Sequence, residues 1–434
     1  MAALRDDLGK LSVVIAERIG NELAEEHVRV RRAGGVPWST DEELLFAQTV
    51  AMNESIRLSN SLVSDGRLAL SIAEQELLTS MAVAQVLGLG RLQLLMDDEE
   101  ISDIHVKGCS PVWVKMRSGT REERPPIVDS DDELVDLIRR AATRLGRAER
   151  RFDSASPELN LQLPDGSRLF AAMEVSLRPT LVIRKHQFSM SRLTELQLRG
   201  LCDPLTASFL AAAVRSKRNI IVCGGTGSGK TTLLRALINE VAPSERIVTI
   251  EDAYELGIDR FHDLHPDHDA LQSRPANIEG HGEITLADLT RMALRMDPDR
   301  VIVGEVRGAE AFPMLLAMSQ GNNGSMCTMH ADSARSVFPK LAAYVSMAST
   351  GLPVETINTL IASALHFVVH IELIDGVRRI KSILEVVDVE GPTITSNEVF
   401  SWSGQGRSRS YSSMRQASRL LLLDHGFEAV GGAA

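Results

Sequence analysis

Apolar residues recur along the chain at two spacings, which predict where helices and strands lie. Residues 1–95 repeat their apolar positions at helical spacing, and Ser39 with Glu42 forms a helix-capping signal. We expect this region to be a helical bundle. Residues 96–192 change to short apolar runs separated by turns, beginning with 101–106. This second region is predicted to be an α+β domain.

Residues 193–390 alternate short β-branched runs with amphipathic segments. The runs that predict strands are 220–223, 247–250, 301–303 and 325–329. Such alternation is typical of a parallel sheet with helices on both faces, so the fold class is α/β. Residues 367–387 add a predicted hairpin around the turn Asp375-Gly376. The Ser- and Arg-rich stretch 391–434 is predicted to be a linker and a tail with one short helix.

The segment 219–232, NIIVCGGTGSGKTT, has the strand, glycine loop and helix of a P-loop. Its glycines let backbone N–H groups approach phosphate at the positive end of the next helix. We expect Lys230 to reach the β- and γ-phosphates of ATP and the Thr231 hydroxyl to bind Mg²⁺. The remaining loop residues expected to contact the nucleotide are Gly225, Thr226, Gly227, Ser228, Gly229 and Thr232.

Glu251, Glu305 and His330 each end a predicted parallel strand. Because ligands bind at the carboxyl ends of such strands, we expect these side chains to converge with the P-loop on one nucleotide. Glu305 is the candidate for the base that orients the attacking water. Many P-loop enzymes have a magnesium-binding Asp just before this base, but here the residue is Gly304.

Composition narrows the range of functions. The net charge of −11 and an aromatic content of 4% argue against a nucleic-acid motor. The chain has no apolar run of about 18 residues and no signal-peptide pattern at its start, so we expect a cytoplasmic protein. Its four cysteines are far apart and are predicted to be reduced. His262, His265 and His268 could hold a metal, but we expect an exposed polar loop there.

Five segments together resemble the secretion ATPase superfamily, and within it the ATPases of the tight-adherence (Flp) pilus, the CpaF/TadA type. The Gly-Glu pair at 304–305 matches the Walker B ending of that family. The similarity extends to LPDGSR at 163–168 and VIRK at 182–185. The five segments are GGTGSGKTTLL (224–234), RIVTIEDAYEL (246–256), RPANIEGHGEIT (274–285), MDPDRVIVGEVRGAEA (296–311) and CTMHADS (327–333).

This resemblance implies a RecA-like P-loop ATPase core and a homo-hexameric ring that uses ATP and Mg²⁺ to power pilus assembly, with retraction as a further role. The ring would lie at the inner face of the cytoplasmic membrane, bound through inner-membrane platform proteins. Glu251 and Glu255 fall in the family's Asp box near the metal, and His330 falls in its His box near the γ-phosphate. Arg168 and Arg184 match arginines that would reach the nucleotide of the adjacent subunit, so the resemblance implies that the α+β domain 96–192 contributes to the subunit interface.

Two departures from the wider family bear on this assignment. Asn322 stands where the family often has a second histidine, and the zinc-binding four-cysteine insert of type II secretion relatives is absent. A conjugative or type IV secretion ATPase would share all the motifs above. A RecA-like nucleic-acid motor and a nucleotide-gated scaffold are further candidates, and Glu305 argues against the scaffold.

Overall fold

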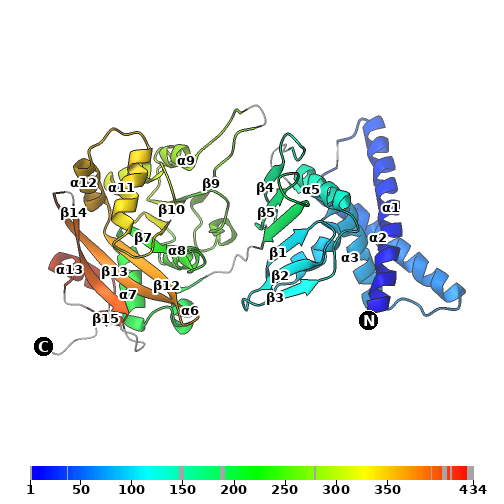
Figure 1. Cartoon of the computed structure of the whole chain (residues 1–434), viewed down its shortest axis with the longest axis horizontal. Helices are drawn as coiled ribbons and strands as arrows, with labels where there is room; N and C mark the ends of the chain where they lie inside the picture. Colours follow the sequence, from blue (N-terminus) through cyan, green and yellow to red (C-terminus); the bar gives the residue numbers. More distant parts are fainter. Residues whose placement is uncertain are drawn as a thin grey trace. The chain divides into compact units, whose positions relative to one another are not determined.

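The computed structural model describes residues 2–36, 38–145, 151–185, 191–277, 280–391, 393–402, 408–410 and 413–427. The chain divides into two units, Met1–Gln187 and Phe188–Ala434, which are coloured blue to green and green to red in Figure 1.

The first unit begins with helices that pack on one another. Helices α1 (Ala2–Arg32), α2 (Thr40–Ser64) and α3 (Ile72–Leu87) share an apolar core that includes Ile15, Ala47 and Leu78 (Figure 1). Ser39 caps α2 and Glu42 completes the box by accepting from the Ser39 N–H at 2.7 Å, as the sequence predicts. The turn η1 (Gly90–Leu92) and α4 (Gln93–Asp97) lead into the following sheet.

The sheet of the first unit is antiparallel, and α5 (Asp131–Leu145) contributes to its core. Alternate residues such as Leu169 and Ile183 are buried on the core face. On the opposite face Phe170 is 38% exposed and Trp113 is 49% exposed. The strand order is β3 (Arg121–Arg124), β2 (Val112–Met116), β1 (Ile101–Lys107), β6 (Thr180–Arg184), β5 (Arg168–Ala172) and β4 (Glu158–Gln162).

The second unit is built on a larger sheet with two kinds of pairing. Strands β12, β7, β11, β10, β8 and β9 pair in parallel, while β12 to β15 pair antiparallel. The predicted hairpin is confirmed as β12 and β13. The strand order is β15 (Ser408–Ser410), β14 (Thr393–Trp402), β13 (Val377–Glu390), β12 (Phe367–Ile374), β7 (Ile220–Gly224), β11 (Met326–His330), β10 (Arg300–Val306), β8 (Ile247–Glu251) and β9 (His268–Gln272).

Helices cover both faces of this sheet. Alternate residues of its strands point to opposite faces, and each face has its own apolar cluster of strand and helix residues. Ile221 and Cys223 face α9 (Leu286–Ala293), α10 (Ala311–Ser319), α11 (Val337–Met347) and α12 (Val354–Ala364). Ile220 and Val222 face α6 (Leu193–Leu198), α7 (Pro204–Arg215), α8 (Lys230–Ile238) and α13 (Gln416–Asp424) (Figure 1). The predicted α/β class, with a P-loop core after an α+β domain and N-terminal helices, is confirmed.

The prediction of a linker and tail over 391–434 is wrong for much of that stretch. Strand β14 is part of the sheet, and its Ile394, Val399 and Phe400 are buried. Arg415 is also anchored, since its Nε lies 3.2 Å from Oε1 of the buried Glu385. The abundance of Ser and Arg obscured the apolar positions. Residues 403–407, 411–412 and 428–434 lie outside the described part of the chain.

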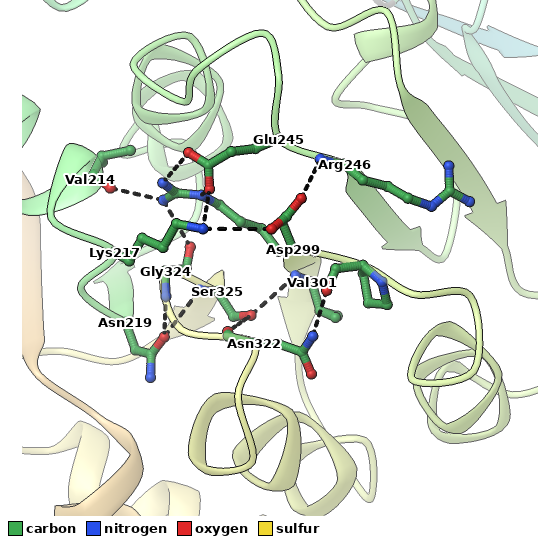
Figure 2. Close-up of polar contacts among 12 residues, drawn as sticks. Val214, Lys217, Asn219, Glu245, Arg246, Asp299, Val301, Asn322, Gly324 and Ser325 are labelled. Atoms are coloured by element: carbon green, nitrogen blue, oxygen red, sulfur yellow. Dashed lines mark hydrogen bonds and ion pairs between the residues drawn. The ribbon is translucent and has the colours of Figure 1, made fainter.

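The amino ends of the parallel strands carry a polar network (Figure 2). Arg300 begins β10 and is completely buried. Its Nε and Nη2 donate to the two carboxylate oxygens of Glu245 at 3.0 and 2.8 Å, and its Nη1 donates to the Val214 carbonyl at 2.9 Å. Lys217 Nζ lies 3.0 Å from the same carboxylate. The network therefore links β10 to α7 and to the loop before β8.

Candidate nucleotide-binding site

The P-loop joins β7 to α8 at the carboxyl edge of the parallel strands. Gly225, Thr226 and Gly227 are exposed, and Gly227 has a φ of 73°, which favours glycine. A Cβ at Gly225 or Gly227 would meet no atom within 4 Å, so the loop is open on that side. The Ser228 hydroxyl is buried without a partner among the described residues. An open glycine loop with an unpartnered hydroxyl fits a bound phosphate group.

Lys230 is the first residue of α8 and is only 7% exposed. Its ammonium donates to the carbonyl oxygens of Gly224 and Gly225 at 3.1 and 2.9 Å. Burial lowers its pKa, and the negative charge of Glu305 opposes that shift. The lysine therefore lies inside the loop with its charge directed to the position a phosphate would occupy.

Glu305 and His330 come from adjacent strands, β10 and β11, and contact each other. His330 Nε2 lies 3.0 Å from Glu305 Oε1, and both ring nitrogens of His330 lie 3.4 Å from Lys230 Nζ. About two fifths of each side chain of the pair is exposed, at 41% for His330 and 37% for Glu305. A base candidate and a histidine that are both accessible thus lie beside the buried P-loop lysine.

Glu251 ends β8 and is 3% exposed, so it is not a solvated charge. Its Oε2 accepts from the backbone N–H groups of Glu255 and Leu256, each at 2.8 Å. The packing also explains Gly304, because a Cβ there would lie 3.1 Å from Glu251 Cγ. Glu251 occupies the space beside β10 that a side chain at 304 would need.

Arg235 was not predicted as a site residue. Burial lowers its pKa, and the charges of Glu255 and Glu251 oppose that shift, so this cation belongs to the same acidic group. Arg378 was also missed: its Nε donates to the Gly227 carbonyl at 3.1 Å. Neither arginine belongs to a recognisable sequence motif. Arg235 lies within α8, and Arg378 lies in β13, far from the P-loop in the sequence.

The described residues contain no group of three or more His, Cys, Asp or Glu side chains placed to hold a metal ion. His265 is buried, its ring nitrogens have no partner among those residues, and burial lowers its pKa, so the expected exposed loop is wrong at this residue. All four cysteines are free, as predicted, and burial raises the pKa of Cys223 to about 12. In the described part of the chain, no helix is long and apolar enough to cross a membrane.

Arg168 and Arg184 are paired directly across β5 and β6 in the first unit. Directly opposed residues of an antiparallel pair share one face of the sheet. Arg184 is 67% exposed, with its Nε 3.3 Å from Asp103 Oδ1. The two arginines therefore lie side by side on the face away from the core of this unit.

Asn322 lies near the amino end of β11, whereas His330 lies at its carboxyl end. The Asn322 side-chain amide donates to the Pro298 carbonyl at 2.5 Å, and the Asn322 backbone carbonyl accepts from the Ser325 hydroxyl at 2.7 Å (Figure 2). Asn322 therefore belongs to the amino-edge network and not to the group around Lys230.

Known proteins are similar to this chain in sequence and in fold. The sequence profile of the family described as "Type II/IV secretion system protein" matches residues 87–421. The chain is 35% identical over 332 residues to a putative conjugal transfer protein of Mycobacterium tuberculosis, covering 74% of this chain and 91% of that protein.

The chain is also 31% identical over 309 residues to the type IV secretion system protein VirB11 of Brucella suis, and the match covers 64% of this chain and 82% of VirB11. The X-ray structure of the Legionella pneumophila ATPase DotB is similar in fold, with a TM-score of 0.50 and 20% identity over 68% of this chain and 79% of DotB.

Proposed function

The chain belongs to the type II/IV secretion system protein family, and from this premise we propose that it is a hexameric ATPase that powers the assembly of a tight-adherence pilus. The ring acts at the cytoplasmic side of the membrane and transfers force to inner-membrane platform proteins. The motifs from the P-loop to the His box at 327–333 resemble those of the pilus ATPases and support the ATPase activity.

The observation that carries the proposal is the contact among Lys230, His330 and Glu305. These residues come from the P-loop helix and from two neighbouring strands, yet His330 lies 3.4 Å from the lysine and 3.0 Å from the glutamate. Hydrolysis of ATP requires a phosphate-binding cation and a base placed near the γ-phosphate. A structural role for Glu305 would not require an accessible carboxylate at this position.

In the proposed reaction, Lys230 exchanges its bonds to the loop carbonyls for bonds to the β- and γ-phosphates. Glu305 accepts a proton from the water whose oxygen forms the new bond to the γ-phosphorus, and the bond to the ADP oxygen breaks. The proton then passes to the released phosphate. His330 holds the Glu305 carboxylate and senses the γ-phosphate.

The residues present also fit a magnesium ion that is bound together with the nucleotide. Mg²⁺ at nucleotide sites is held by one or two protein oxygens together with the substrate phosphates. Thr231 at the start of α8 and Glu251 at the end of β8 would hold it. The ion would neutralise charge on the phosphates.

A second candidate is a conjugative or type IV secretion ATPase. The names of the relatives favour it, since one is a putative conjugal transfer protein and another a type IV secretion system protein. Both candidates use the same ATPase site and differ in the machine that receives the force.

The ATPase assignment is tested with Lys230→Ala. We expect this variant to lose ATP binding and hydrolysis, because the buried ammonium is the cation inside the P-loop. Calorimetric titration with Mg-ATP and a phosphate-release assay measure both quantities. Lys381→Ala is the matched control, since Lys381 is a half-exposed lysine of the same unit whose Nζ lies 3.6 Å from Glu372. Normal turnover in Lys230→Ala would contradict the assignment.

An experiment in cells distinguishes the pilus ATPase from the conjugative or type IV secretion ATPase. A strain that lacks the chain is complemented with the wild type or with Lys230→Ala, and surface pili and plasmid transfer are both counted. The pilus proposal predicts that pili disappear without the wild-type chain while transfer is unchanged. Loss of transfer with normal pili would support the second candidate.

A further inference from the structure

Arg378 reaches the P-loop from a different part of the same chain. It lies at the beginning of β13, and its Nε donates to the Gly227 carbonyl at 3.1 Å. The P-loop segment 224–232 contains one cation of its own, Lys230, so Arg378 is a second positive charge at the loop.

Gly229 provides the room for this arginine. A Cβ at Gly229 would lie 2.9 Å from Arg378 Cδ, closer than two carbon atoms can pack. Gly229 also has a φ of 98°, in the region that favours glycine. The missing side chain thus serves both the backbone turn and the approach of Arg378.

The hairpin that carries Arg378 is held firmly. Asp375 and Gly376 both have positive φ angles, 51° and 75°, as a two-residue hairpin turn of type I′ requires. The neighbouring Arg379 has its guanidinium carbon 4.4 Å from the centre of the Trp402 ring, and its Nη1 donates to the Gly200 carbonyl at 3.2 Å. These contacts fix the start of β13, and so the stem of Arg378.

We propose that Arg378 is a positioning residue that holds the P-loop in its phosphate-binding conformation. In a trans peptide the C=O and the following N–H point in opposite directions. Holding the Gly227 carbonyl on the Arg378 side therefore keeps the Ser228 N–H on the other side, where it donates to the Gly225 carbonyl at 3.4 Å. The Lys230 ammonium donates to the same Gly225 carbonyl, so a phosphate bound beside Lys230 would replace this carbonyl as the acceptor of the Ser228 N–H. This role rests on the proposed nucleotide-binding function and deepens it, because it assigns part of the affinity to the β12–β13 hairpin.

The consequence is a change in affinity rather than in chemistry. Loss of a charge-assisted hydrogen bond at an accessible loop is expected to weaken nucleotide binding about tenfold. ADP and ATP should be affected alike, because Gly227 and Ser228 belong to the loop that surrounds the phosphates shared by both nucleotides. The bond of Arg378 is to the loop and not to Glu305 or His330, so the kcat should remain within about threefold of the wild type.

The test compares Arg378→Ala, Arg378→Lys and Lys381→Ala in the full-length chain. Calorimetry with Mg-ADP and with Mg-ATPγS gives the Kd values, and steady-state hydrolysis gives KM and kcat. We expect Arg378→Ala to raise both Kd values and the KM about tenfold. Arg378→Lys should recover part of the affinity, because lysine keeps the charge but not the planar donor fork. Lys381→Ala should resemble the wild type.

Unchanged Kd values in Arg378→Ala, or a lost kcat with unchanged Kd values, would overturn the proposal. If Arg378→Ala does not fold, as judged by thermal melting, Arg378→Gln decides by the same criteria, since glutamine keeps most of the side-chain volume. A wild-type chain that binds neither nucleotide would instead contradict the proposed function itself, so the two failures are distinguishable.

Discussion

Glu305 and its neighbours give the sharpest expectation at the level of single residues. Glu305→Gln should keep ATP affinity, because Lys230 and the P-loop backbone remain intact, but it should lose at least about 100-fold in rate, the scale of general-base effects. Single-turnover hydrolysis and calorimetry measure the two quantities separately. Glu372→Gln, which removes an exposed carboxylate of β12, is the matched control.

Loss of ATP binding in Glu305→Gln would show that the carboxylate is structural. Retained turnover would show that another group orients the water. Either result would remove Glu305 from the proposed mechanism while leaving the P-loop assignment to the Lys230→Ala experiment.

Residues whose position follows from the local sequence could be brought together without a structure. Lys230, Glu305 and His330 each follow a recognisable strand or loop, and the rule that parallel strands end at one edge predicts that they meet. Arg378 and Arg235 could not be found in this way. Their positions depend on which strands are neighbours and on how closely they pack, and neither quantity is encoded in a short motif.

At the level of elements, Arg300 shows how the start of β10 is stabilised. Arg300→Ala would leave the Glu245 carboxylate without its bidentate partner in a buried network, which typically costs about 3–5 kcal/mol. Arg291→Ala is the control, because Arg291 is 58% exposed and pairs with Asp288 at 3.1 Å on the surface of α9. Its loss should cost no more than about 1 kcal/mol.

Urea denaturation followed by the fluorescence of Trp402 measures these two variants. Trp402 is in the second unit, and replacing Trp38 and Trp113 by phenylalanine makes it the sole reporter. Equal midpoints for Arg300→Ala and Arg291→Ala would show that the buried network contributes no more to stability than a surface pair.

Strands with a continuous apolar run were predictable, whereas two strands at sheet edges, β3 and β9, were missed. Strand β7 reads as one continuous apolar run because it is buried on both faces. Strand β3, with the sequence REER, has no apolar residue, as charged edge strands often do. Strand β9, HDALQ, lies at an edge of the larger sheet and is half-buried throughout. β9 has no alternation of buried and exposed residues, so the apolar pattern does not predict its parallel pairing with β8.

At the scale of the whole molecule, the proposed ring makes the two units of the chain act on different nucleotides. Phosphoryl transfer gains about 10³ to 10⁵ in rate from an arginine, often supplied by a neighbouring chain. We propose Arg168 and Arg184 for this role, since they lie side by side on the face of their sheet away from the core. Hexamers of Arg168→Ala or of Arg184→Ala should be nearly inactive.

Mixing tests this proposal directly. Arg168→Ala chains keep the base and Glu305→Gln chains keep the arginine, so mixed rings should regain ATPase activity at interfaces that combine both. In the control, Arg168→Ala chains are mixed with chains that carry both Arg168→Ala and Glu305→Gln. No chain of this mixture has an intact Arg168, so activity should not return. If subunit exchange is confirmed and the mixtures stay as inactive as their parents, arginine action across the interface is the wrong mechanism.

The contact between Gly304 and Glu251 has an evolutionary consequence. A Cβ at 304 would come within 3.1 Å of Glu251 Cγ, so a larger residue at 304 requires the Glu251 side chain to shift by a few tenths of an ångström. An aspartate introduced at 304 would be accommodated more easily once position 251 carried a shorter side chain. The two positions, on β10 and β8, are therefore coupled in their tolerance to substitution, and a change at 251 opens the way to a change at 304.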